Sequence, residues 1–67
     1  MSDTDTLLIR MSVINTFISA KESDIKKMIQ QPDKYSKKDI KVIKDVVKEY
    51  TKQLTEVQQE YTRQLNN

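Results

Sequence analysis

The chain has 67 residues, 12 of them Lys or Arg and 10 Asp or Glu, with a formal net charge of +2. It contains no cysteine, histidine or glycine, which excludes disulfides, most zinc and transition-metal sites, and glycine-rich phosphate loops. A folded chain of this size buries only about 60% of its extended surface, so we expect a partner chain to supplement its core.

The residue inventory also argues against an enzyme. Without histidine or cysteine the chain lacks the common pairs of nucleophile and base. Its carboxylates stand mostly near lysines, as Glu22 does four residues before Lys26, and such pairs stabilise helices. We therefore expect no catalytic residues, no metal ligands and no cofactor.

The apolar segment LLIRMSVINTFISA, residues 7–20, has to be distinguished from a signal peptide or a membrane anchor. Asp3 and Asp5 precede it where a signal peptide carries positive charge, and Arg10 and Asn15 interrupt it. A membrane span needs roughly 20 predominantly apolar residues. We expect a soluble, cytoplasmic protein that makes no membrane contact.

Apolar residues recur along the first half of the chain at steps of three, four and seven: Leu7, Met11, Ile14, Ile18, Ile25 and Met28. This spacing predicts an amphipathic helix over about residues 5–31, with Ile29 on the same apolar face. Pro32 lacks an amide hydrogen and disfavours helical geometry at the residue before it, so the helix should end there. Ser2 and Asp5 have the spacing of a capping box without a hydrophobic staple, so we expect the first turn to fray.

Three signals for the start of a second helix follow the proline. The hydroxyl of Ser36 can accept from the backbone amide of Asp39, and the Asp39 carboxylate can reach back to the amide of Ser36. Tyr35 and Ile40 occupy the two positions of a hydrophobic staple around this capping box. The chain therefore breaks once and restarts within a few residues.

The second helix is predicted over about residues 36–65, after a turn over 32–35. Its apolar residues alternate at steps of three and four, the spacing of a coiled-coil seam: Ile40, Ile43, Val47, Tyr50, Leu54, Val57 and Tyr61. Two helices of similar length joined by a short turn favour an antiparallel hairpin. The predicted fold class is all-α, a single helical-hairpin domain over residues 1–67, completed by a partner chain or by self-association.

The first helix carries more apolar surface than one seam requires. Ile9, Val13 and Ala20 form a second patch on the far side of Phe17 when residues are placed about 100° apart. Isolated exposed aliphatic residues are common on any protein surface, but we favour a contact with another chain. The predicted partner-binding residues are Ile9, Val13, Phe17 and Ala20.

A row of lysines marks one side of the second helix: Lys37, Lys41, Lys44 and Lys48. A phosphate backbone or an acidic partner would bind such a row, although a solvated face is the simpler interpretation. This row supports an alternative function, that of a small phage- or plasmid-type regulator that binds nucleic acid or a nucleic-acid enzyme.

The turn carries a resemblance. Lys26 and Lys27 approach a Pro-x-x-Tyr element, Pro32 to Tyr35, that opens a second long helix. This arrangement resembles the small co-chaperones of type III secretion needle assembly, which are helical hairpins of similar length. The resemblance implies binding to a tetratricopeptide-like chaperone, the pair holding a needle subunit unpolymerised in the cytoplasm. Needle and rod subunits, hairpins with a proline turn, are a nearby structural alternative.

The leading hypothesis is therefore a small adaptor or co-chaperone that stabilises another protein and has no chemistry of its own. Its partner would be another protein chain or a second copy of itself.

Overall fold

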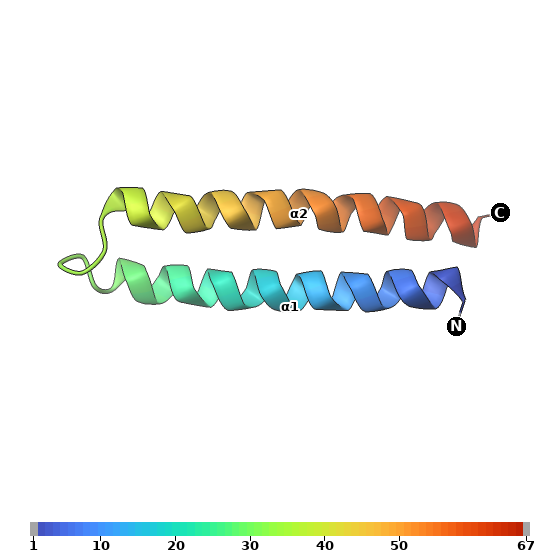
Figure 1. Ribbon diagram of the computed structural model, residues 1–67, viewed down its shortest axis with the longest axis horizontal. Coiled ribbons are helices and arrows are strands. Elements are labelled where there is room, and N and C mark those ends of the chain that lie inside the picture. Colours follow the sequence, from blue (N-terminus) through green and yellow to red (C-terminus); the bar gives the residue numbers. More distant parts are fainter. Residues whose placement is uncertain (1, 67) are drawn as a thin grey trace.

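The computed structural model describes residues 2–66, which form two α-helices and no strand. Helix α1 spans Asp3–Ile29 and helix α2 spans Lys37–Leu65. They run antiparallel, so both termini lie at one end of the molecule and the turn lies at the other (Figure 1). The predicted all-α helical hairpin is confirmed.

Helix α1 begins two residues earlier than the sequence predicts. The Ser2 hydroxyl accepts from the amide of Asp5 at 3.2 Å, and Asp3 and Asp5 lie in the first turn, where negative charge complements the helix dipole. A hydroxyl cap and two carboxylates hold this turn together without a staple. The helix ends at Ile29, two residues before the predicted end, with Gln30 as its C-cap.

The connection between the helices is held by two backbone hydrogen bonds to Gln31 and by the predicted N-cap of α2. The amides of Lys34 and Tyr35 both donate to the carbonyl of Gln31, at 3.0 and 3.1 Å. The Ser36 amide donates to the Asp39 carboxylate at 2.9 Å, and the Asp39 amide donates to the Ser36 hydroxyl at 3.2 Å. The capping box is confirmed, and Ser36 itself is the cap that precedes the first helical residue.

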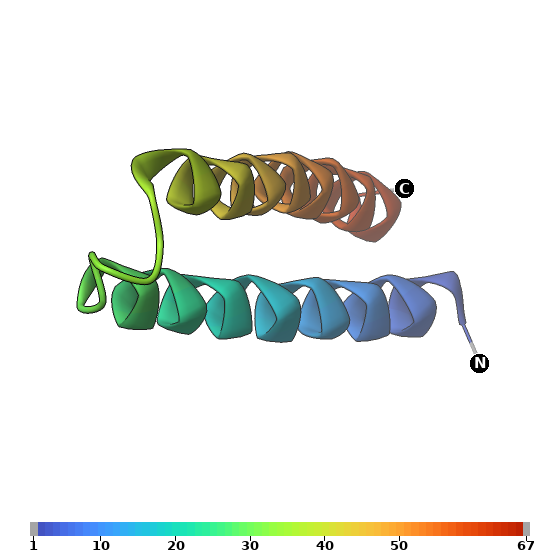
Figure 2. The same cartoon turned by 60° about the vertical axis from the view of Figure 1, so that its left-hand side comes forward.

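The core is small and is displaced toward the termini. Its four buried side chains are those of Leu7, Ile14, Ile18 and Val57. Five partly buried residues of the two apolar series pack against them: Met11, Val47, Tyr50, Leu54 and Tyr61. The molecule measures 53 × 16 × 12 Å, and Figure 2 shows the two helices side by side with nothing covering either broad face.

Three positions along the apolar face of α1 differ from the predicted seam. Ile29 is 55% exposed, because α1 ends there and α2 begins only at Lys37, so the opposing helix offers little to cover it. Ile25 is half-buried. Lys21 occupies the helical position between Ile18 and Ile25, where the apolar series jumps seven residues. Its side chain is half-buried, with the ammonium 5.3 Å from the centre of the Phe17 ring.

We predict that Ser36→Ala lowers the free energy of unfolding by about 1 kcal/mol, because the Asp39 amide loses its acceptor at the start of α2. The control is Ser19→Ala, an exposed position inside α1, which should be neutral or slightly stabilising because alanine is the better helix former. Urea unfolding followed by circular dichroism measures both. Equal stability of Ser36→Ala and the wild type would contradict the role given to this cap.

We predict that Ile14→Ala destabilises the fold by about 2–5 kcal/mol, because it removes a buried side chain from a core of four. The matched control is Val42→Ala, at a side chain that is 56% exposed and should change stability by less than about 0.5 kcal/mol. The melting temperatures of the two variants, measured by thermal unfolding, test this prediction. Similar melting temperatures would show that the seam does not hold the hairpin together.

Candidate protein-interaction surfaces

The first candidate surface is the side of α1 that faces away from α2. The side chains of Ile9 and Val13 are 51% and 63% exposed, and Ala20 is exposed as well. The spacing of the seam residues Leu7, Ile14 and Ile18 turns these three positions outward, as the sequence predicts. The structure thus places three of the four predicted partner-binding residues together on one open helix face.

Phe17, the fourth predicted partner-binding residue, belongs instead to the contact between the helices. Its ring centre lies 4.4 Å from that of Tyr50, at an interplanar angle of 42°. The Lys21 ammonium stacks over the same ring from within α1. The aromatic side chain reaches toward α2 from the flank of the seam, so Phe17 is half-buried and positions the helices.

Leu8 is an exposed apolar residue that the sequence analysis did not single out. Its side chain is 45% exposed, and it precedes Ile9 by one residue, so the two point to different sides of α1. The signal was available in the run Leu7-Leu8-Ile9, because three consecutive apolar residues cannot all face one seam. Exposed apolar surface near the start of α1 is therefore wider than the predicted patch.

The second candidate surface is the lysine row of α2. Lys37, Lys41, Lys44 and Lys48 are all exposed, and neither of the two ion pairs within residues 2–66 involves them. Three of them line an open groove of about 370 Å³ together with Ile29 and Ile40. The row therefore combines positive charge with a small apolar floor at the turn end of the molecule.

The residues that carry the co-chaperone resemblance lie around the turn. Lys26 and Lys27 occupy the last turn of α1 and are exposed. Pro32 lies within the turn, and Tyr35 is half-buried with the Lys34 ammonium 5.8 Å from its ring centre. Tyr35 also lines a groove of about 290 Å³ with Met28 and Ile43. These residues form and flank the turn, and their geometry does not distinguish a co-chaperone from another helical hairpin with a proline turn.

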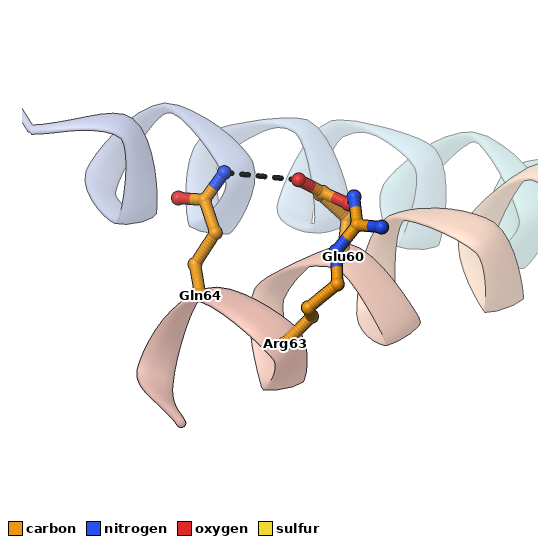
Figure 3. A network of polar contacts seen from close by, with 3 residues as sticks. All are labelled: Glu60, Arg63 and Gln64. Carbon is orange, nitrogen blue, oxygen red and sulfur yellow. Dashed lines mark hydrogen bonds and ion pairs between the residues drawn. The ribbon is translucent and has the colours of Figure 1, made fainter. Parts of the chain in front are cut away.

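In the C-terminal part of α2, the Glu60 carboxylate is paired with side chains of the same helix. Arg63 pairs with the Glu60 carboxylate, and the Gln64 side-chain amide donates to the other Glu60 oxygen at 3.1 Å (Figure 3). On the same helix, Glu49, Glu56 and Glu60 line a groove of about 430 Å³ that Arg10 of α1 also lines. The open end of the hairpin therefore presents mostly negative charge.

The described part of the chain shows no cluster of side chains suited to binding a metal ion. Residues 2–66 contain no group of three or more carboxylates, histidines or cysteines placed to hold a metal ion. Over the same residues, neither helix combines the length and the apolar character that crossing a bilayer requires.

Comparison with known proteins finds no family model, no curated protein and no solved structure that matches the chain.

Proposed function

We propose that this protein is a small adaptor or co-chaperone that acts by binding another protein chain through the outward face of α1. The observation that carries the proposal is the pair Ile9 and Val13, 51% and 63% exposed on a helix whose seam is already occupied by other residues. Contiguous exposed apolar surface that the fold does not bury is a mark of protein-interaction sites.

The thinness of the core supports the same proposal. Four side chains are buried, and even the most buried of them, Val57, keeps 5% of its surface exposed. A domain normally needs a second layer to enclose its apolar residues, and a two-helix hairpin has none. A bound chain would supply that layer and stabilise the hairpin by mass action.

The resemblance at Lys26, Lys27, Pro32 and Tyr35 suggests the class of partner. In the co-chaperones that it resembles, the hairpin binds a tetratricopeptide-like chaperone in the cytoplasm and helps to keep a needle subunit unpolymerised. We propose that class of partner and that compartment for this chain too, with no catalytic step by the hairpin itself. A needle- or rod-type structural subunit is the alternative within the same architecture.

We predict that Ile9→Gln/Val13→Gln loses its partner while keeping its helix content, because both side chains face away from α2. Immobilised wild type and variants are incubated with extract of the source cells, and bound proteins are quantified by mass spectrometry. The control is Val42→Gln, a comparably exposed valine, 56%, on the other helix. It should retain the partner that the wild type retains.

Circular dichroism of each variant separates binding from folding. A double variant that is helical and still binds the same partner as the wild type would refute the assignment of this face. A partner retained by the wild type and by Val42→Gln, but lost with the outward face of α1, would support it.

Nucleic-acid binding through the lysine row is the second candidate function. It is favoured by the exposure of Lys37, Lys41, Lys44 and Lys48 and by the lack of carboxylate partners for them within residues 2–66. The partly apolar groove beside them would suit an acidic protein better than a phosphate backbone, so we rank this function below the first.

This second function makes a quantitative prediction about salt. Four phosphate contacts give a slope of about −3.6 in a plot of log affinity against log salt concentration for double-stranded DNA. Changing the four lysines to glutamine should abolish both the binding and the slope in fluorescence anisotropy. A slope near zero, or affinity unchanged by the four substitutions, would eliminate the lysine row as a nucleic-acid site.

A further inference from the structure

We propose that the outward face of α1 binds a second copy of this chain, with the two hairpins antiparallel so that their turns lie at opposite ends of the dimer. The inference rests on the proposed function in that it uses the same face; it differs in the occupant, a second copy of this chain in place of a chaperone, and it specifies the orientation. Three features of the hairpin lead to it: how its charge is distributed, the pattern of side-chain sizes along α1, and the surface that a stable dimer must bury.

The first feature is the separation of charge along the molecule. The hairpin brings residues 21–48, with nine lysines and five carboxylates, to the turn end, a formal charge of +4. Residues 2–20 and 49–66, with three basic and five acidic side chains, lie at the open end, a formal charge of −2. Figure 1 shows both chain ends on the side opposite the turn.

This separation distinguishes the two ways in which identical hairpins can pair along their length. With the turns at the same end, +4 lies beside +4, and like charges repel. With the turns at opposite ends, each positive end lies beside a negative one. The acidic first turn of α1, with Asp3 and Asp5, then runs beside the basic last turn of the second copy, with Lys26 and Lys27.

The second feature is an exposed stripe along α1 with steps of four, three, four, three and four: Ile9, Val13, Thr16, Ala20, Ser23 and Lys27. This is the spacing of a helix–helix seam, and it is the second such seam on α1. Its two large apolar side chains, Ile9 and Val13, lie in the N-terminal half; the small residues Thr16, Ala20 and Ser23 follow, and Lys27 ends the stripe. An antiparallel pair sets large against small, which lets two helices pack closely.

The third feature is size. A stable interface buries about 800 Å² on each partner, roughly one-seventh of the 5335 Å² of surface that this chain exposes. A contact along most of α1, which is 27 residues and about 40 Å long, can reach that area. A short peptide on Ile9 and Val13 would not, so the length of the stripe favours another long helix as the occupant.

The orientation can be measured because the chain has no cysteine, so one introduced cysteine carries one spin label. Asp33→Cys labels the exposed turn. In the proposed dimer the two labels are separated by close to the molecular length of 53 Å. With the turns together they would lie within roughly 20 Å, two helix diameters. Double electron–electron resonance distinguishes the two distances.

Sedimentation equilibrium tests the contact itself. We expect a mass of twice 7.9 kDa, a dissociation constant that rises with salt because opposite charges are screened, and an increase of more than about tenfold in Ile9→Gln/Val13→Gln. Val42→Gln should behave as the wild type. A dimer that tightens with salt, or labels that lie close together, would overturn the proposed orientation.

A monomer at every accessible concentration would overturn the dimer but not the proposed function. In that case the pull-down still reports whether a different protein binds the same face. If instead the double variant dimerises as well as the wild type and remains helical, the outward face of α1 is not the dimer contact and the dimer proposal is overturned, while the pull-down decides the proposed function separately.

Discussion

Two helices can share only one seam, and the rest of this structure depends on that constraint. Every apolar side chain outside the seam remains in contact with water, whatever its chemistry, because no second layer exists to cover it. The seam itself encloses little: Val57 is the most buried residue of the described chain and is still 5% exposed. Additions such as disulfides or a zinc ion, which small domains commonly use, require cysteine or histidine, and this chain has neither. A larger core would therefore require apolar surface from outside the hairpin of residues 2–66.

The turn determines how the seam and the charges are arranged. Pro32 stops α1, and the reciprocal hydrogen bonds of Ser36 and Asp39 start α2, so the reversal needs neither glycine nor a residue with positive φ anywhere in residues 2–66. The same reversal gathers the lysine-rich middle of the sequence at one end and both acidic flanks at the other. Lysines in the first turn of α2 oppose the helix dipole, and Asp39, which also closes the capping box, is the acidic residue of that turn.

The fold could be predicted from the sequence because its determinants are local. Proline stops, capping spacing and periods of three and four residues act within one or two turns of helix, and both helices, the hairpin and the capping box followed from them. The positions of Ile29 and Phe17 could not be predicted in this way. Whether Ile29 is covered depends on where the other helix begins, and the side to which the Phe17 ring turns depends on Tyr50 across the seam. The exposure of Ile9 and Val13 was predictable from the seam, because both positions lie on the opposite side of α1 from Leu7 and Ile14.

The displacement of the core toward the termini has a consequence for how the chain folds. A helical hairpin is usually regarded as a fast folder, because its contacts can form progressively outward from the turn. Here the residues next to the turn, such as Ile25 and Ile40, are only half-buried, so contacts formed there contribute little. The buried cluster instead joins Leu7 to Val57, fifty residues apart in the sequence. More of the loop-closure entropy is therefore lost before the most buried contacts form, and we expect slower folding than for a hairpin whose core lies next to its turn.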